Sequence, residues 1–380
     1  MSNTLDAIVP KIIAHGVEAL RSNCIMPRLV NTDYSDEVAQ KGDTINIPIP
    51  TTVTAVPVVP AANNPTLEDT VISTYPLNLS QNYRSPMFHL TDKEQTMVAE
   101  GVYFPMQAEE GINSLAVYID QYIMGLYKSV YGYVGTAGTT PFASTIGAAT
   151  DARVALNKQL APQRNRRMVL NPEAEGNASG LRNFQDMNFA NSGDDIKNGI
   201  LSNKLGFGWF MDQNIPEHTA GVKGGTLTIN GAHATTGVTA VSVANSAAGA
   251  LAEGDILTFA GDSQTYVVGA DVTWGSAGNQ SVTIQPGLKV ALSGSEAITQ
   301  MADHVVNLAF QRNAIAFASR PMDGIDKSRF GVVSETVVDP VSGVALRLEI
   351  QSGHKTIQWC YDVLFGAALP RPELACRVAG

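Results

Sequence analysis

The sequence predicts a mixed α+β fold with a long two-stranded ribbon and a small all-β domain inserted into it. Three observations lead to this prediction. Between Gly42 and Leu90, strand-forming residues alternate with prolines and charge is almost absent. From Met106 to Tyr133, apolar residues recur at helical spacing, and from Val222 to Gln300 the composition shifts to Thr, Val, Ala, Gly and Ser in short runs. Periods of two and of 3.6 residues are the signals of strands and helices.

The bulk composition is that of a globular protein that does not grip nucleic acid. The chain has 380 residues, 44% of them hydrophobic and 16% charged, which is enough to bury a large core. Its net charge is −10, whereas proteins that bind the phosphates of nucleic acid need a basic surface. Any contact with DNA is therefore expected to be loose. No apolar run approaches the roughly 18 residues of a membrane span, so we expect a soluble protein without a membrane partner.

The cysteines and histidines are too widely spaced for a metal or disulfide framework. Cys24, Cys360 and Cys376 form no Cys-x-x-Cys pair, which indicates synthesis in a reducing cytosol. Metal and cofactor sites are therefore not expected. The six histidines are His15, His89, His218, His233, His304 and His354.

Residues 1–40 are expected to form an amino-terminal arm. Leu5, Ile8, Ile12 and Val17 recur at helical spacing, and Pro10 forces a break or kink. An amphipathic helix of this kind packs on its own domain, on a partner subunit or on a membrane surface. The acidic balance of the chain disfavours the membrane surface.

Residues 41–90 are expected to form an extended hairpin. Its two arms flank a polar turn at Asn63-Asn64-Pro65, and its prolines each remove a ladder donor, which confines them to edges. A two-stranded ribbon is barely stable alone in water. We therefore expect its apolar cover to come from another copy of the same chain.

Residues 91–149 are expected to form a domain built on a long helix. Thr91 and Glu94 have capping-box spacing, which predicts a short helix to about Glu100. The helix predicted from Met106 to Tyr133 would span roughly 40 Å, long enough to act as a spine. Its tyrosines are more typical of packing than of a binding stripe.

The rest of the chain is expected to form a lobe, an insertion and a closing sheet. Residues 150–221 predict an α/β lobe, with a helix to Leu160, a strand at Arg167–Leu170, a turn at Asn171-Pro172 and then helical segments to about Leu201. Residues 222–300 predict a small β-barrel or sandwich. Residues 301–380 contain four strand-like segments, expected to form one antiparallel sheet beneath the long helix: Val305–Phe310, Ala314–Ala318, Val344–Ile350 and Thr356–Gly366.

No residue constellation has the spacing of a catalytic site, so the chain is not expected to be an enzyme. The acidic run from Ser192 to Gly199 lacks the alternating acids of a calcium loop and favours a turn before a helix. Arg164, Arg166 and Arg167 form the only basic cluster, which could clamp a phosphate or a neighbour's carboxylate. The alternative for this cluster is a solvated edge beside the following strand.

The order of these elements resembles the major capsid proteins of tailed double-stranded DNA bacteriophages, and most closely the coat proteins of short-tailed Salmonella phages, which carry an inserted β-barrel. The segments that carry the resemblance are Arg167–Pro172, Asn214–Gly221, Glu253–Gly261 and Asn307–Ala314. The resemblance implies the Hong Kong 97-type capsid fold, with an N-arm, an extended E-loop hairpin, a peripheral domain with a spine helix and an axial domain. The chain is short for the inserted-domain branch, so a reduced barrel is expected.

The resemblance also implies function and partners. It implies a shell subunit of the virion, made in the bacterial cytoplasm, that assembles into hexamers and pentamers and meets a scaffolding protein, a portal and a decoration protein. Packaged DNA would be touched only loosely. The residues expected at contacts between subunits are Asp6, Glu18, Val56, Val58, Val59, Asn63, Asn64, Arg164, Arg166 and Arg167. Asp6 and Glu18 are also the acidic residues of the arm with which basic residues of the scaffolding protein are expected to pair.

Two other function classes remain open from the sequence. The β-rich segment 222–300 is also typical of a binding or adhesion module that recognises a ligand such as surface carbohydrate. An unrecognised hydrolase would have to assemble its site from scattered Ser, His and Asp residues.

Overall fold

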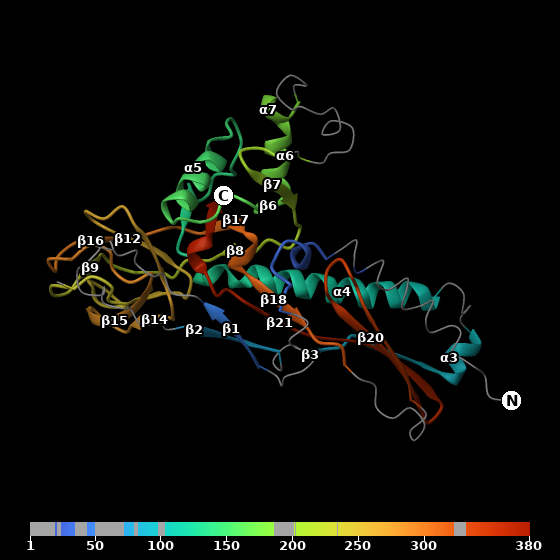
Figure 1. Ribbon diagram of the computed structural model, residues 1–380. Coiled ribbons are helices and arrows are strands. Elements are labelled where there is room, and N and C mark those ends of the chain that lie inside the picture. Colours follow the sequence, from blue (N-terminus) through green and yellow to red (C-terminus); the bar gives the residue numbers. More distant parts are fainter. Residues whose placement is uncertain are drawn as a thin grey trace, which may run out of the picture. The chain divides into compact units, whose positions relative to one another are not determined.

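Figure 1 shows the computed structural model of the protein. The structure describes residues 20, 24–34, 44–49, 72–79, 83–97, 103–185, 201, 203–233, 235–322 and 332–380. The chain forms two compact units. Unit 1 comprises residues 1–21, 32–115 and 316–370, and unit 2 comprises residues 22–31, 116–315 and 371–380.

Unit 1 is built on an antiparallel sheet. Its order is β18 (Ala316–Ser319), β21 (Thr356–Ala368), β20 (Ala345–Gly353) and β19 (Val332–Val338), with β3 (Tyr83–Arg84) and β4 (Met87–Thr91) also paired to β21. Gly111 lies against this sheet, because a Cβ added there would be 3.6 Å from the Tyr361 ring. Gly111 belongs to helix α4 (Tyr103–Gly125). Within unit 1, the sheet therefore packs against the long helix as predicted.

The base of the predicted hairpin is present, but its cover differs from the prediction. Strands β1 (Thr44–Ile49) and β2 (Ser73–Asn78) pair in antiparallel register. One face of this pair is buried in its own subunit, in a cluster formed by Ile45, Ile47, Leu77, Leu79, Ala316, Ala318 and Ala368. The expectation that the ribbon finds its apolar cover on another copy is thus wrong for the base, because the alanines of β18 and β21 leave room for the larger hairpin side chains. The tip, including Val56, Val58, Val59, Asn63 and Asn64, lies outside the described residues.

The short helix and the spine helix form where the sequence places them. Helix α3 (Asp92–Met97) begins with the predicted capping box, in which the Thr91 backbone N–H donates to Glu94 Oε2 at 2.9 Å. Helix α4 ends at Gly125, eight residues before the predicted Tyr133, and continues as the 3₁₀ turn η3 (Leu126–Ser129). The backbone becomes extended at Val130, and Gly132 then lies close to the backbone of Ala375, where a Cβ would be 2.9 Å from the carbonyl oxygen.

Unit 2 is built on a mixed sheet. Its order is β5 (Tyr133–Gly135), β22 (Ala375–Ala379), β17 (His304–Gln311), β6 (Arg166–Leu170) and β7 (Phe207–Met211), with β8 (Glu217–His218) also paired to β17. The β22–β5 and β6–β7 pairs are parallel. The prediction that the four closing strands share one antiparallel sheet is therefore wrong: β17 belongs to the mixed sheet. The 3₁₀ turn η4 (Arg312–Ala314) separates β17 from β18.

In the described part of unit 2, three helices that follow β5 accompany the mixed sheet. They are α5 (Gly147–Lys158), α6 (Pro172–Gly180) and α7 (Arg182–Gln185). Helix α6 starts at the predicted Asn171-Pro172 turn, where Asn171 Oδ1 accepts from the Ala174 N–H at 3.1 Å. The first three residues after this cap include the proline that a helix start favours.

The inserted segment forms a closed barrel of six strands, as predicted. Its order is β10 (Ala240–Asn245), β15 (Gly278–Gln285), β13 (Thr265–Val268), β12 (Ile256–Phe259), β16 (Ala297–Gln300) and β9 (Leu227–Ile229), with the pair β11 (Gly249–Leu251) and β14 (Val272–Trp274) beside it. Apolar side chains including Leu257, Phe259, Tyr266 and Ile284 fill its interior. Closure removes exposed sheet edges, which favours a stable small domain.

Candidate functional site

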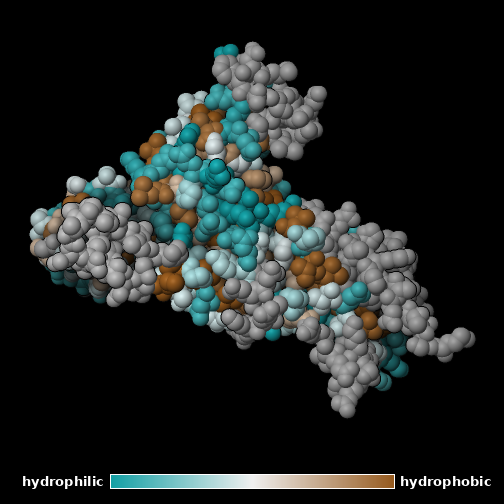
Figure 2. Space-filling model, viewed as in Figure 1, coloured by the Kyte–Doolittle hydropathy of each residue, from teal (hydrophilic) through white to brown (hydrophobic). Residues whose placement is uncertain are grey.

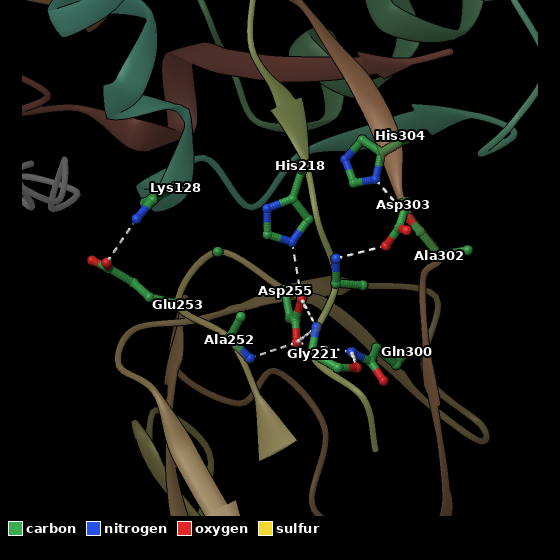
Figure 3. A network of polar contacts seen from close by, with 12 residues as sticks. Lys128, His218, Gly221, Ala252, Glu253, Asp255, Gln300, Ala302, Asp303 and His304 are labelled. Atoms are coloured by element: carbon green, nitrogen blue, oxygen red, sulfur yellow. Dashed lines mark hydrogen bonds and ion pairs between the residues drawn. The ribbon is translucent and has the colours of Figure 1, made fainter. Parts of the chain in front are cut away.

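The chain leaves the mixed sheet for the barrel and returns from it at one place, which we call the neck (residues 217–221 and 300–305). Strands β8 and β17 pair here in antiparallel register, with His218 opposite His304 and Glu217 opposite Val305. The Ala220 N–H donates to Asp303 Oδ1 at 2.8 Å, which ties the two crossings together (Figure 3). The barrel is thus joined to the sheet by a ladder and not by two loose linkers.

Asp255 is the centre of the neck (Figure 3). Its carboxylate is fully buried and accepts hydrogen bonds from His218 Nε2 at 2.9 Å, from Gln300 Nε2 at 2.8 Å and from the Ala252 N–H at 2.8 Å. The Gly221 N–H also points at both of its oxygens, at 3.3 and 3.2 Å. A buried carboxylate is stable only when its oxygens are satisfied in this way. Asp255 therefore joins barrel residues to both crossings of the neck.

Arg377 of β22 provides the neighbouring positive charge. Its side chain is fully buried and donates to three backbone carbonyls: Nε to Val130 at 2.9 Å, Nη1 to Gly254 at 2.8 Å and Nη2 to Lys128 at 3.4 Å. Its guanidinium also lies over the Tyr127 ring, 5.0 Å from the centroid. Burial lowers its pKa to about 10, so Arg377 remains a cation at neutral pH. This one side chain connects the end of the spine helix, the mixed sheet and the barrel.

The barrel also rests on an apolar contact. Tyr131 packs with Ile256 and Val267 of the barrel, and the Thr265 hydroxyl donates to the Tyr131 carbonyl at 2.7 Å. The ion pair between Lys128 and Glu253 adds little, because both side chains are 46% exposed and such pairs contribute about 1 kcal/mol or less.

The two neck histidines have different surroundings. His218 donates through Nε2 to Asp255 and meets the Tyr127 hydroxyl through Nδ1 at 3.1 Å. His304 donates through Nδ1 to the Ala302 carbonyl at 2.8 Å, and its Nε2 has no hydrogen-bond partner among the described residues. Burial lowers the pKa of His304, and the charge of Arg377 lowers it further. His304 is therefore held in its neutral form.

The neck has the residue types of a catalytic dyad but not the access. His218 and Asp255 are hydrogen-bonded, yet their side chains are 4% and 0% exposed. A catalytic pair must reach a substrate, whereas this carboxylate is fully used in holding backbone and side-chain donors. Within the described part of the chain, no group of three His, Cys, Asp or Glu residues could hold a metal ion. The arrangement is a structural joint.

A second buried carboxylate anchors residues 24–31, which belong to the later part of the predicted amino-terminal arm. Asp120 of α4 is fully buried and accepts from the backbone N–H groups of Ile25 and Met26, both at 3.0 Å. The Cys24 thiol lies 3.5 Å from the same carboxylate. Burial raises the pKa of Asp120 to about 7 although the two backbone hydrogen bonds oppose this.

The predicted arginine cluster is divided by the structure. Arg166 is buried and donates to Asn157, Ala161 and Pro162 of its own chain. Arg167 is half-buried and donates to the Arg28 carbonyl at 2.9 Å. Arg164 is exposed. Asp6 and Glu18 lie outside the described residues, so contacts between subunits at these positions stay predictions.

Sequence reasoning missed the roles of His218 and Asp255 at the neck and of Asn307 further along β17, although it singled out the segments that contain them. His218 lies in Asn214–Gly221, Asp255 in Glu253–Gly261 and Asn307 in Asn307–Ala314. Asn307 Oδ1 accepts from the Asn171 N–H at 2.7 Å, and its Nδ2 donates to the Val378 carbonyl at 3.1 Å. A sequence indicates a buried polar side chain most clearly when that residue interrupts an apolar strand. Of His218, Asp255 and Asn307, only Asn307 does so.

In sequence, neither a protein-family model nor a curated protein matches the chain. In structure, the chain is similar to one described as Mycobacterium phage Che8, with a TM-score of 0.53 and 12% identity over 93% of this chain and 90% of that chain. It is also similar to one described as "Capsid structure of the Cyanophage P-SCSP1u", with a TM-score of 0.49 and 11% identity over 92% and 85% of the two chains. A TM-score of 0.49 is too low to carry an argument.

The likeness to the phage Che8 chain covers nearly the full length of both chains. No helix in the described part of the chain combines the length and the hydropathy of a membrane span. At 12% identity the likeness concerns the fold alone. The chain has the predicted mixed α+β fold of the Hong Kong 97 type, with a six-stranded barrel inserted between β8 and β17.

Proposed function

We propose that the chain is the major capsid protein of a tailed double-stranded DNA bacteriophage. It assembles through hexamers and pentamers into the icosahedral shell around the genome. The observation that carries this proposal is the fold shared with a phage chain over 93% of the sequence. The chain has no enzymatic role, and its buried His218–Asp255 pair serves to hold the barrel.

The surface of the described residues suits repeated weak contacts. The hairpin base leaves large apolar side chains exposed, with Ile72 at 65% and Tyr75 at 40% exposed. A shell of many copies is stable even when each contact is weak, because the contacts act together. An acidic chain of net charge −10 also touches packaged DNA only loosely, so that the genome can enter and leave.

The finer proposals concern the branch and the partners. The barrel between β8 and β17 favours the branch of short-tailed Salmonella phages with an inserted domain. As partners we propose other copies of the chain, a scaffolding protein in the precursor shell, a portal and a decoration protein. The division into a peripheral domain, an axial domain and an arm belongs to the same proposal.

The experiment is to express the full chain with and without the scaffolding protein from the same source genome. Sedimentation velocity and negative-stain electron microscopy are expected to reveal closed particles of shell size. Monomers or dimers under all conditions, including with the scaffold present, would contradict the proposal. A glycan screen with the same protein tests the adhesion alternative, and the proposed function predicts no binding.

A further inference from the structure

The loop between α5 and β6 exposes an apolar side chain in an unusual backbone conformation. Leu160 is 88% exposed and has φ of 59°, in the left-handed region. Asn165, at the other end of the loop, has φ of 55°. Asparagine tolerates this region, whereas leucine is disfavoured there. Neither burial nor backbone preference in the subunit explains a leucine at position 160.

The shape of this loop is fixed from inside by Arg166. Its Nε donates to the Pro162 carbonyl at 2.9 Å, and its Nη2 donates to Asn157 Oδ1 at 2.8 Å and to the Ala161 carbonyl at 2.7 Å. The Arg312 N–H also donates to the Asn165 carbonyl at 3.1 Å. A planar guanidinium with several partners restrains a loop well. Leu160 is thus presented on a rigid support.

The surface around this loop is basic in an acidic protein. Residues 150–167 contain five of the 25 Lys and Arg residues but only one of the 35 Asp and Glu residues, and of these five Lys158 and Arg164 are exposed whereas Arg166 is buried. Lys158 and Arg164 are exposed on either side of Leu160 in the sequence. Because the whole chain has a net charge of −10, the surface with the complementary charge is abundant on other copies of the chain.

We propose that Leu160, together with Lys158 and Arg164, is a knob that docks on an acidic surface of a second copy of the chain. This inference rests on the proposed function and assigns one of its contacts. An apolar tip flanked by basic residues fits a protein surface better than a phosphate backbone, to which leucine adds nothing. The face viewed in Figure 2 carries its hydrophobic residues in small separate patches, which is consistent with contacts made by single apolar side chains.

The charge of the knob also sets the symmetry of the contact. Two knobs facing each other across a twofold axis would bring like charges together, which is unfavourable. This excludes a contact of one knob with another, and the knob of one copy therefore lies on a different surface of the next, as it does in a heterologous contact. Heterologous contacts close into rings when the rotation allows it, as hexamers and pentamers require.

The test compares four full-length variants in the assembly reaction. Leu160→Asn removes the apolar tip but suits the left-handed conformation, and Arg164→Glu reverses the charge. Val290→Asn and Lys289→Glu are the matched controls, because both residues are exposed on the barrel. Leu160→Asn is expected to keep the melting temperature of the subunit or raise it. Both loop variants are expected to raise the concentration at which particles form by about tenfold, while the controls leave it unchanged.

A second measurement identifies the partner surface without any substitution. Carbodiimide couples lysines to nearby carboxylates, and particles made from mixed ¹⁵N and ¹⁴N subunits distinguish links between copies from links within one. Mass spectrometry is expected to find Lys158 joined to an Asp or Glu of another copy.

The outcomes separate this inference from the proposed function. If the wild-type chain never forms particles, the proposed function fails. If wild-type particles form and both loop variants assemble at the wild-type concentration, the knob is wrong and the proposed function stands. Normal assembly of Arg164→Glu with reduced DNA retention would assign the basic surface to DNA and overturn the inference, as would the absence of links between copies from Lys158.

Discussion

His218 and His304 lie opposite each other on the β8–β17 ladder, with ring centroids 5.3 Å apart, at the one place where the chain crosses between the mixed sheet and the barrel. Only His218 has a carboxylate partner, since Asp255 is hydrogen-bonded to its Nε2. His304 contacts the Tyr133 ring edge-on at 5.3 Å and lies in the field of Arg377. A proton added to His304 would therefore place a second buried cation beside the first.

The first prediction concerns acid sensitivity at the neck. The pKa of His304 is lowered from its ordinary value of 6.5, so the unfolded chain binds more protons than the folded chain below that pH. The stability that His304 confers is present above pH 6.5 and is lost as the pH falls toward its folded pKa. Chemical unfolding of wild type and His304→Phe between pH 8 and pH 5 measures this.

Phenylalanine at position 304 keeps the edge-on packing and cannot titrate. We expect the variant to lose about 1 kcal/mol at pH 8, because the hydrogen bond to Ala302 is gone. The difference in the free energy of unfolding between wild type and His304→Phe should become smaller as the pH falls. A gap that stays constant or widens toward pH 5 would show that His304 is not the titrating group.

The second prediction concerns Asp255. Both carboxylate oxygens of Asp255 accept hydrogen bonds. In Asp255→Asn, the amide NH₂ group replaces one of these oxygens, and in either orientation of the amide it would face a hydrogen-bond donor. We expect a loss of about 3 kcal/mol and faster hydrogen exchange at the neck, with slow exchange retained in the barrel core. Asp271→Asn is the control, since Asp271 is exposed and accepts from one backbone N–H, that of Glu253, at 2.7 Å. Equal losses in the two variants would contradict a special role for Asp255.

The sequence predicted the elements of this fold better than their partners. The capping box at Thr91, the Asn171-Pro172 helix start and the barrel were predicted because each depends on local pattern. The assignment of β17 to the mixed sheet was not, because an apolar strand does not reveal which sheet it joins. The neck was missed for a similar reason: His218 and Asp255 are 37 residues apart, and only the closed barrel brings them together.

The hairpin illustrates the same limit. Alternation in β1 correctly indicated one apolar face, to which β2 contributes Leu77. The identity of its cover depended on Ala316, Ala318 and Ala368, far along the chain, whose small side chains give no sequence signal of a docking surface. Small residues are recognisable as a complementary surface only once the sheet has formed.

The third prediction concerns Asp120 and has the opposite pH dependence. The pKa of Asp120 is raised from 3.8 to about 7 by burial, so the folded chain binds more protons between these values. Its contribution to stability is fully present below pH 3.8 and is lost as the pH rises through about 7, by an amount on the order of 4 kcal/mol. Asp120→Asn should remove this loss, so that the free energy of unfolding of the variant increases relative to that of wild type between pH 5 and pH 8.

Unfolding curves for wild type and Asp120→Asn at fixed pH values check this difference. Asp212→Asn is a useful comparison, because Asp212 is also buried and its pKa is also raised by burial, but it caps its own turn at Asn214 and does not hold the 24–31 segment. The rate of proteolysis near Cys24 should change in Asp120→Asn and should not change in Asp212→Asn. If wild type and Asp120→Asn depend on pH identically, Asp120 stays ionised and the argument fails.

The fourth prediction concerns the close backbone approach at Gly221. A Cβ at this position would lie 2.6 Å from the Ala250 carbonyl oxygen and 2.6 Å from the Ala252 nitrogen, and backbone atoms cannot move aside as a side chain can. Gly221→Ala should therefore cost about 2 kcal/mol or more and disturb the hydrogen bonds to Asp255. Gly176→Ala is the matched control: Gly176 lies in α6 with open space around it, so alanine should stabilise the chain by about 0.5 to 1 kcal/mol. A melting temperature of Gly221→Ala that equals or exceeds that of wild type would mean that the neck tolerates a side chain at Gly221 and that the barrel is held less closely than its hydrogen bonds indicate.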